Sequence, residues 1–441
     1  MTAPFAGRAL HFIGIGGAGM SGLALVARRL GATVTGSDQA ESSYCERLRE
    51  AGIEPVIGHD AANVPEGAEV VVSTAIPEEN PELAAARAAG ARVLHRGDLL
   101  GELSRMKRVI AVGGTHGKTT TASMAALALL ETGRDPAFLI GGELRAGGTN
   151  AAWGEGEWAV IEADESDRSF LKLKRDVAVV TNIELDHHAT YANLRELEGA
   201  FEDFVQPADV WVAGPGIPAA GEVVTFGIES GDLSARNVHL GPGTSDFEVE
   251  GVPVALRVPG AHNVLNALAA LAALRAAGVP IEEAAPALAG FTGAGRRFER
   301  HGTTQSGADV YDDYAHHPTE VRATLEAART LEPRRLVACF QPHLYSRTRM
   351  LAREFGRALA LADLVVVLDV YRARERPDDF PGVSGYLVAE AAADFAEGRP
   401  VWWLPGIDDA ERHIRAELAE GDVLLTLGAG DVDELARRLS P

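Results

Sequence analysis

The sequence predicts an α/β protein of three domains, and three observations support this fold class. The chain has 441 residues, whereas single domains mostly hold about 100–200 residues. Short apolar runs alternate with helical segments along the chain, which is typical of parallel sheets covered by helices. Two glycine-rich turns each stand between an apolar run and a helical segment. We therefore expect domains at residues 1–107, 108–296 and 297–441.

The composition excludes several classes of partner. Hydrophobic residues make up 46% of the chain and charged residues 24%, as in an ordinary globular protein. The net charge of -22 disfavours binding to nucleic acids and to anionic membranes. Cys45 and Cys339 fit neither a disulfide framework nor a metal motif, so we expect buried thiols in a reducing compartment. We expect a cytoplasmic monomer or weak homodimer that binds no nucleic acid and no membrane.

The first domain is expected to be Rossmann-like. Its predicted elements are strands at residues 10–15, 33–36, 70–74 and 93–95 and a helix at residues 19–30. Gly14, Gly16 and Gly19 have the G-x-G-x-x-G spacing, and Asp38 follows the second strand. This fingerprint places a pyrophosphate at a helix N-terminus, and a side chain at Gly16 would enter that space. Taken alone, it indicates an NAD-binding enzyme.

The second glycine-rich turn has the chemistry of a phosphate loop. It lies between a predicted strand at residues 108–112 and a predicted helix at residues 122–130, and it comprises Gly114, Thr115, His116, Gly117, Lys118, Thr119 and Thr120. Its glycines let backbone N–H groups surround phosphate oxygens, Lys118 neutralises phosphate charge, and Thr119 can ligate Mg²⁺. Val112 stands where the first glycine of the usual motif would be. We therefore expect a P-loop ATPase-like central domain with ATP as co-substrate.

Acidic residues at neighbouring strand ends predict a site for one or two Mg²⁺ ions. Glu162 begins an acidic stretch at the end of a strand predicted at residues 159–163, and His187 follows the strand predicted at residues 177–182. Mg²⁺ bound to a triphosphate needs carboxylate support. We predict Thr119, Glu162 and His187 as metal ligands. The alternatives are a solvated acidic loop and a structural histidine.

The remaining predicted elements extend the α/β pattern. They are strands at residues 210–212, 223–226, 336–340, 364–369, 401–404 and 423–427 and a helix at residues 263–277. The last four strands predict a Rossmann-like C-terminal domain. The loop at residues 293–297 is the expected hinge on which this third domain closes.

Six motifs, in order along the chain, resemble those of the Mur ligases, which build the stem peptide of peptidoglycan precursors. They are the shortened phosphate loop, Glu162 in Glu-Ala-Asp-Glu-Ser-Asp, Asp186-His187, the run from His262 to Ala267, Arg297 in Gly-Arg-Arg-Phe-Glu, and the run from Asp313 to Pro318. The resemblance covers essentially the full chain. It implies a ligase that phosphorylates a carboxylate with ATP and couples the acyl phosphate to an amine.

The resemblance also implies residue roles. His262 and Asn266 would hold adenine, Arg297 and Asp313 would contact ATP, and Lys118, His316 and Arg347 would be catalytic. The implied contacts to a UDP-sugar are Gly16, Gly17, Ala18, Gly19, Met20, Ser21, Asp38, Ser73, His343 and Arg347. Instead of contacting a ligand, Asn266 could cap or pack its own helix, and Asp313 and His316 could each stabilise a turn.

Within the family, the first glycine turn and Gln341-Pro342-His343 are most similar to the enzyme that joins L-alanine to UDP-N-acetylmuramate. ATP, L-alanine and UDP-N-acetylmuramate are therefore the expected partners. Three departures exist, one of which is Arg372-Ala373-Arg374-Glu375 in place of small residues. The other two concern possible ligand contacts. Leu344 replaces an arginine present in some relatives, and no lysine occurs at residues 190–204, where several relatives carry a carbamylated one.

Three alternatives stay open. NAD could occupy the first turn, although a UDP-sugar carries the same pyrophosphate and the neighbouring phosphate loop favours it. The protein could be a nucleotide-regulated switch that makes no bond. It could also be the related recycling ligase, which attaches a whole peptide to the same UDP-sugar.

Overall fold

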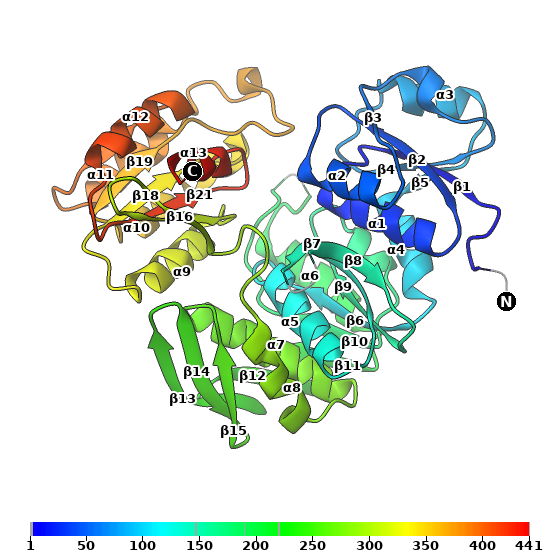
Figure 1. Cartoon of the computed structure of the whole chain (residues 1–441), viewed down its shortest axis with the longest axis horizontal. Coiled ribbons are helices and arrows are strands. Elements are labelled where there is room, and N and C mark those ends of the chain that lie inside the picture. Colours follow the sequence, from blue (N-terminus) through cyan, green and yellow to red (C-terminus); the bar gives the residue numbers. More distant parts are fainter. Residues whose placement is uncertain (1–2, 146–147, 189, 219–220, 441) are drawn as a thin grey trace. The chain divides into compact units, whose positions relative to one another are not determined.

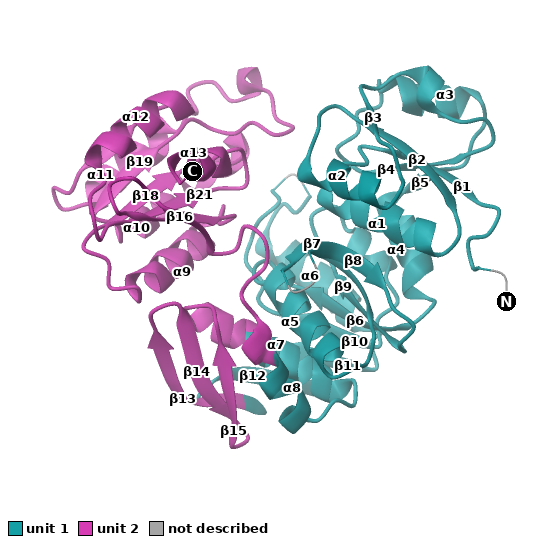
Figure 2. Ribbon diagram, in the orientation of Figure 1, with its two compact units in different colours: residues 1–233, 267–287 teal, residues 234–266, 288–441 magenta. Residues whose placement is uncertain are grey.

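The computed structural model describes residues 3–145, 148–188, 190–218 and 221–440. The chain forms two compact units (Figure 2): unit 1 holds residues 1–233 and 267–287, and unit 2 holds residues 234–266 and 288–441. The predicted α/β class is confirmed in both. The predicted domain boundaries at 107/108 and 296/297 stay predictions. Among the described residues, no helix combines the length and apolar character that a membrane span requires.

The N-terminal part of unit 1 is a parallel sheet of five strands in the order β3-β2-β1-β4-β5. The strands are β1 (Ala9–Ile13), β2 (Thr33–Asp38), β3 (Val56–Ile57), β4 (Glu69–Val72) and β5 (Val93–His95), and the helices are α1 (Ala18–Arg29), α2 (Ser43–Glu50), α3 (Pro81–Ala88) and α4 (Arg96–Ser104). The strand order reverses between β1 and β4. In such sheets ligands bind beyond the carboxyl ends of the strands at this switch point.

The central part of unit 1 carries strands in the order β12-β11-β10-β6-β9-β7-β8 (Figure 1). All of these pairings are parallel except the β7–β8 hairpin. The elements are β6 (Arg108–Gly113), α5 (Lys118–Glu131), β7 (Ala137–Leu144), β8 (Thr149–Trp153), β9 (Trp158–Glu162), β10 (Val177–Val180), α6 (Leu194–Val205), β11 (Val210–Ala213), β12 (Val223–Ile228), α7 (Ala261–Ala276), which begins in unit 2, and α8 (Ile281–Ala287).

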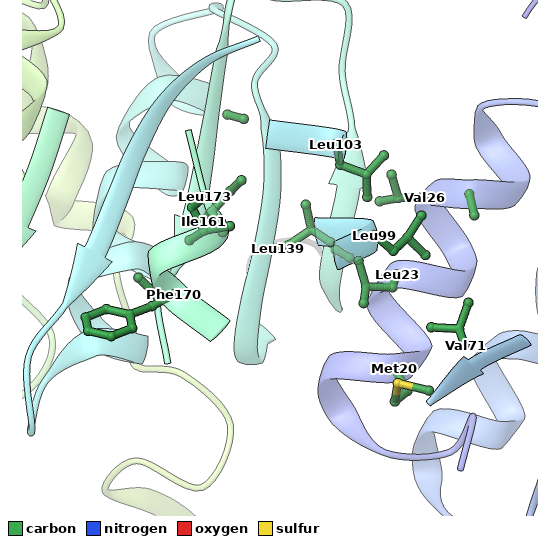
Figure 3. Close-up of a cluster of buried hydrophobic side chains, with 14 of the residues drawn as sticks. Met20, Leu23, Val26, Val71, Leu99, Leu103, Leu139, Ile161, Phe170 and Leu173 are labelled. Atoms are coloured by element: carbon green, nitrogen blue, oxygen red, sulfur yellow. The ribbon is translucent and has the colours of Figure 1, made fainter. Parts of the chain in front are cut away.

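One buried hydrophobic cluster joins the two sheets of unit 1 (Figure 3). It includes Met20, Leu23 and Val26 of α1, Leu99 and Leu103 of α4, Leu139 of β7, Ile161 of β9, and Phe170 and Leu173. The Asn150 side chain also donates a hydrogen bond of 2.6 Å to the carbonyl of Ala18 at the start of α1. Burial of apolar surface therefore holds the first glycine turn and the phosphate loop on one body.

Unit 2 contains an antiparallel meander and a six-stranded sheet. The meander is β13 (Leu233–Gly241), β14 (Thr244–Val249) and β15 (Val252–Leu256). The six-stranded sheet has the order β16-β17-β21-β18-β19-β20 and is parallel apart from β16. Its elements are β16 (Glu299–Thr303), β17 (Asp309–Asp313), α9 (Pro318–Arg329), β18 (Leu336–Phe340), α10 (Tyr345–Leu359), β19 (Leu364–Val367), α11 (Tyr386–Phe395), β20 (Val401–Trp403), α12 (Ile407–Glu417), β21 (Val423–Leu427) and α13 (Asp433–Leu439).

Short 3₁₀ helices complete the chain: Ala61–Asn63, Ser169–Lys172, Leu288–Gly290 and Pro377–Asp379. Every strand predicted from the sequence is present, although several ends differ. The first strand stops at Ile13 because Gly14 adopts φ of 81° and begins the turn. The prediction that both cysteines are buried is confirmed, and both are free. The hairpin β7–β8 and the meander were not predicted, because their strands mix polar and apolar residues without a clear period.

Candidate active site

The phosphate loop follows β6 and enters α5, and its shape depends on residues after β10. Gly114 and Gly117 adopt φ of 125° and 80°, which favour glycine. A Cβ atom at Gly114 would lie 2.1 Å from Thr181 Oγ1. The Asn182 side chain accepts a hydrogen bond from His116 N at 2.8 Å and donates one to His116 O at 3.0 Å. The loop is therefore fixed by the neighbouring strand end as well as by its own glycines.

The Lys118 ammonium group lies inside this loop. It donates hydrogen bonds to the carbonyls of Gly114 at 2.7 Å and Thr115 at 3.1 Å, and it pairs with Glu165 Oε2 at 2.9 Å. Burial favours the neutral amine, but the carboxylates around it, Glu165 foremost, raise the pKa of Lys118 above its ordinary value. Lys118 therefore stays charged, as phosphate binding requires.

Thr119 and Glu162 are candidate metal ligands that lie in contact with each other beside the phosphate loop. Thr119 Oγ1 donates to Glu162 Oε1 at 3.0 Å, and Gly141 N donates to Glu162 Oε2 at 2.6 Å. A Cβ atom at Gly141 would lie 2.9 Å from both carboxylate oxygens, so glycine leaves room for this side chain. Burial raises the pKa of Glu162. The adjacent Thr120 is also buried.

A second group of candidate ligands lies beside Lys118. Ligand atoms of Asp164, Glu165 and His187 all lie within 4.8 Å of one another, and His187 Nε2 is 3.4 Å from Glu165 Oε1. Although burial opposes ionisation, the neighbouring Arg96 and Lys118 lower the pKa of Asp164. The hydroxyl and carboxylate oxygens of the two groups are the ligands that Mg²⁺ prefers, so these residues fit the predicted ion.

Arg96, the first residue of α4, connects the acidic cluster to the first glycine turn. Its Nη2 atom is 2.8 Å from Asp164 Oδ2 and 3.1 Å from Asp167 Oδ2. A Cβ atom at Gly19 would lie 3.3 Å from Arg96 Nη1. A cavity of about 230 Å³ opens here, and its lining includes Gly19, Arg96, Gly141, Asn150, Glu162 and Asp164. The cavity therefore runs from the first turn to the candidate metal ligands.

The first glycine turn is held by residues near the second strand of its sheet. Gly16 N donates to Asp38 Oδ2 at 2.8 Å, and Ser42 Oγ donates to Gly16 O at 2.9 Å. A Cβ atom at Gly16 would lie 2.8 Å from Cys45 Sγ and 3.0 Å from Asp38 Oδ2. A side chain at Gly16 would therefore strike the protein itself before it met a pyrophosphate, a restraint that the sequence interpretation did not include.

Of the other residues predicted to contact the UDP-sugar, those in unit 1 lie at the same edge of the sheet, whereas His343 and Arg347 belong to unit 2. Gly17 is the N-cap of α1 and Ala18 its first residue. The side chains of Met20 and Ser21 are buried, so they can support the turn but offer little contact surface. Ser73 directly follows β4, across the switch point from the turn.

In unit 2, Asp313 and Arg297 lie beside β17 and α9. Asp313 accepts hydrogen bonds from Phe298 N at 2.7 Å and Ala315 N at 2.8 Å, and burial raises the pKa of Asp313 to about 6. The Arg297 guanidinium lies 5.3 Å from the centre of the Tyr314 ring. The predicted turn-stabilising contacts of Asp313 are thus present, while its proposed contact with ATP stays a prediction.

His316, His343 and Arg347 come together in the same unit. His316 Nδ1 lies 2.9 Å from Tyr314 O, and its ring centre is 6.0 Å from that of His343. The His343 ring stacks on Tyr371 at 5.7 Å, and Arg347 Nη1 lies 3.2 Å from His343 Nδ1. Arg347 is only 2% exposed. Two imidazoles and one buried cation therefore meet where a substrate carrying a carboxylate could be recognised.

The start of α7 carries the two residues predicted to hold adenine. Asn266 Nδ2 donates to Asn263 Oδ1 at 3.3 Å, so the structural alternative for Asn266, packing within its own helix, has support. Burial, reinforced by Arg297, lowers the pKa of His262 to about 4. His262 is therefore a neutral ring at pH 7, which suits contact with a base.

Four residues of this arrangement were not predicted from the sequence: Arg96, Asp164, Glu165 and Asn182. Asn182 carried a usable signal, because it ends a predicted strand beside the phosphate loop as Glu162 does. Asp164 and Glu165 stood in the acidic stretch without a reason to separate them from its other members. Arg96 had no signal, since its partners Asp164 and Asp167 are 68 and 71 positions away.

The chain matches three family models in order: Mur ligase family, catalytic domain, over residues 9–108; Mur ligase middle domain over residues 112–274; and Mur ligase, glutamate ligase domain, over residues 296–430. It is similar to the UDP-N-acetylmuramate–L-alanine ligase of Acidithiobacillus ferrooxidans, with 46% identity over 97% of this chain and 96% of that protein.

Two solved structures are also similar. A UDP-N-acetylmuramate-alanine ligase from Thermotoga maritima has a TM-score of 0.83 and 31% identity, and a murein peptide ligase from Psychrobacter arcticus has a TM-score of 0.74 and 27% identity. Each alignment covers 98% of both chains. With family models matched along most of its length and a relative this similar, the chain belongs to the Mur ligase family.

Proposed function

We propose that this protein joins L-alanine to the lactate carboxylate of UDP-N-acetylmuramate and uses ATP to activate that carboxylate. The observation that carries the proposal is in unit 1. The cavity beside Arg96 connects the first glycine turn to Glu162 and Asp164, next to the phosphate loop. A sugar nucleotide bound at the turn could therefore extend its carboxylate toward the γ-phosphate of ATP. The UDP-N-acetylmuramate–L-alanine ligases similar to this chain support the choice of substrates.

In the first step the substrate carboxylate attacks the γ-phosphorus of ATP, which gives an acyl phosphate and ADP. Lys118 neutralises the phosphate charge that develops, and the loop amides orient the phosphates. Thr119, Glu162 and His187 would hold Mg²⁺, with Asp164 and Glu165 nearby. Bound there, Mg²⁺ would supply positive charge to the phosphate oxygens. In the second step the amine of L-alanine attacks the acyl carbon, and phosphate leaves.

We propose the remaining roles from the resemblance to the Mur ligases. Backbone groups of the first turn, from Gly16 to Ser21, receive the pyrophosphate, with Ser73 across the switch point. In unit 2, His262 and Asn266 are assigned to adenine, and Arg297 and Asp313 to the nucleotide. Arg347 with His343 meets substrate charge, and His316 steers or deprotonates the incoming amine. The free, buried cysteines support a cytoplasmic location.

A second candidate is attachment of a whole peptide to the same UDP-sugar. The similarity to the murein peptide ligase from Psychrobacter arcticus favours considering it. The two activities share the phosphate loop and the sugar nucleotide, so they differ only in the amine that is accepted. L-alanine is preferred here because the more similar full-length structure is that of an alanine ligase.

The test is phosphate and ADP release with UDP-N-acetylmuramate, ATP and a panel of L-alanine, glycine, L-serine and the free tripeptide stem. We expect L-alanine to give the largest kcat/KM, and Lys118→Ala to lower turnover by about 10³-fold or more. Tripeptide use without alanine use would support the second candidate. ATP and sugar-nucleotide binding without release in any mixture would support a switch protein, and binding of NADH at the first turn would reject the sugar-nucleotide assignment.

A further inference from the structure

The Lys118 ammonium group has as many hydrogen-bond donors as it has partners: two in the phosphate loop and one outside it. A lysine ammonium group offers three N–H donors and no acceptor. Two of them serve the carbonyls of Gly114 and Thr115, and the third faces the Glu165 carboxylate, whose oxygens lie 2.9 and 3.2 Å from Nζ. A phosphate oxygen can gain a direct contact with Lys118 only by replacing or sharing one of these acceptors. The two carbonyls belong to the loop itself, so Glu165 is the acceptor that can be exchanged.

Glu165 is built to remain in place when this exchange occurs. Its side chain is only 1% exposed, and a buried carboxylate without a partner is strongly unfavourable. His187 Nε2 stands 3.4 Å from Glu165 Oε1 and provides a second partner. Tyr191 Oη donates to the Glu165 carbonyl at 2.8 Å, which anchors the backbone of this residue. The carboxylate therefore stays close to the phosphate site whether or not it holds Lys118.

The other two carboxylates near the loop have different partners. Glu162 accepts hydrogen bonds from Thr119 and Gly141, and Asp164 pairs with Arg96. Glu165 is thus the carboxylate that contacts the lysine directly. Its negative charge competes with phosphate oxygens for Lys118 and repels them once they are bound.

We propose that Glu165 is a positioning residue that makes nucleotide binding depend on a divalent cation. It holds Lys118 against the loop carbonyls, and it penalises a triphosphate that arrives without a cation to offset the carboxylate. A nucleotide that brings Mg²⁺ supplies positive charge that offsets Glu165, so Lys118 can turn to the phosphates. This deepens the proposed function, because it rests on the phosphate loop being the ATP site.

Nucleotide binding without turnover tests this role. The dissociation constants of ATP and ADP are measured by calorimetry in excess EDTA and in excess MgCl₂, with no sugar nucleotide and no amino acid. We expect Glu165→Gln to bind ATP in EDTA about tenfold more tightly than wild type, and to change the affinity in MgCl₂ by less than about threefold. If Glu165 merely kept the loop in shape, the same variant would bind ATP more weakly in both buffers, and the proposal would be overturned.

Two controls isolate the contact with Lys118. Asp164→Asn removes an equal charge from the same cluster, but that charge is paired with Arg96. Its affinity for ATP in EDTA should rise clearly less than that of Glu165→Gln. An equal rise would mean that any lost negative charge has the same effect, and it would reject the proposal. The double variant Lys118→Met with Glu165→Gln should bind ATP in EDTA no more tightly than Lys118→Met alone, because no lysine remains to be released. A tenfold gain in that background would also reject it.

The stability of Glu165→Gln is checked by thermal unfolding before binding is measured. If it does not fold, Glu165→Asp replaces it, since the shorter carboxylate keeps its charge but withdraws from Lys118. Tighter ATP binding in EDTA then supports the proposal, and unchanged or weaker binding overturns it. L-alanine-dependent phosphate release by the wild type is recorded in parallel. Its absence would refute the proposed substrates, while the nucleotide affinities would still decide the role of Glu165.

Discussion

Asn182 offers a sharp test of how the phosphate loop is held, because it lies outside the loop motif. Its side chain accepts from His116 N at 2.8 Å and donates to His116 O at 3.0 Å. Asn182→Ala deletes both bonds but keeps the backbone bond from Thr115 N to Asn182 O, at 3.0 Å. The loop should therefore lose its preferred shape without losing its attachment.

The expected size follows from these two bonds. Each hydrogen bond is worth about 0.5–1.5 kcal/mol net, so the variant should lose roughly 1–3 kcal/mol of stabilisation of the loop shape. If ATP selects that shape, the same free energy is subtracted from binding, and every 1.4 kcal/mol corresponds to about a tenfold change. We expect the KM for ATP to rise about tenfold to a hundredfold, with little change in the KM for UDP-N-acetylmuramate.

The assay is steady-state ADP release with each substrate varied in turn, together with urea unfolding. Asn193→Ala is the matched control, because Asn193 caps α6 by accepting from Glu196 N at 3.1 Å and its loss should cost a similar ~1 kcal/mol of stability. It should leave the KM for ATP unchanged. If Asn182→Ala unfolds as expected and still binds ATP like wild type, or if both variants weaken ATP equally, the loop is not held in the way described.

Three further predictions concern other parts of the protein. Gly16→Val should weaken UDP-N-acetylmuramate binding at least about tenfold, because its Cβ would press on Cys45 and Asp38 and displace the turn. Titration should show an unchanged affinity for ATP. An equal loss of affinity for both ligands would contradict the assignment of the first glycine turn to the sugar nucleotide and of the phosphate loop to ATP. His316→Ala should lower kcat by about tenfold or more with a small effect on the KM for ATP, and normal turnover would leave His316 as a turn residue. The lowered pKa of His262, about 4 in the folded chain against ~6.5 unfolded, means that the unfolded chain binds the extra proton between these values. The stability contributed by a neutral His262 is complete above pH ~6.5 and is lost as pH falls toward 4. The free energy of unfolding of His262→Asn, measured with urea, should therefore fall less steeply over this pH range than that of the wild type. Parallel plots of unfolding free energy against pH would refute the lowered pKa of His262.

Much of the fold could be predicted because many of its strands and helices are specified by the residues within each element. The strand Leu336–Phe340 and the strand Val423–Leu427 were predicted to the residue, since both are uninterrupted apolar runs. The helix after the phosphate loop was expected from residue 122 but begins at Lys118, because the left-handed Gly117 before it allows the first turn to form at once. Irregular hairpins such as β7–β8 escaped prediction, because their strands mix polar and apolar residues without a clear period.

Local spacing and periodicity specify the phosphate loop, the acidic strand end at Glu162 and the α/β class, so these features could be predicted from the sequence. The side chains that hold those motifs in place become evident in the folded chain alone. Asn182 meets His116 across 66 positions and Arg96 meets Asp164 across 68. No local pattern encodes such pairs. Asn182 and His116 meet because β10 and β6, which precede them, pair in one sheet. Arg96 and Asp164 follow strands of different sheets, which the hydrophobic cluster of unit 1 joins. The pairing of β6 with β9, rather than any motif, puts the exchangeable carboxylate of Glu165 within reach of Lys118.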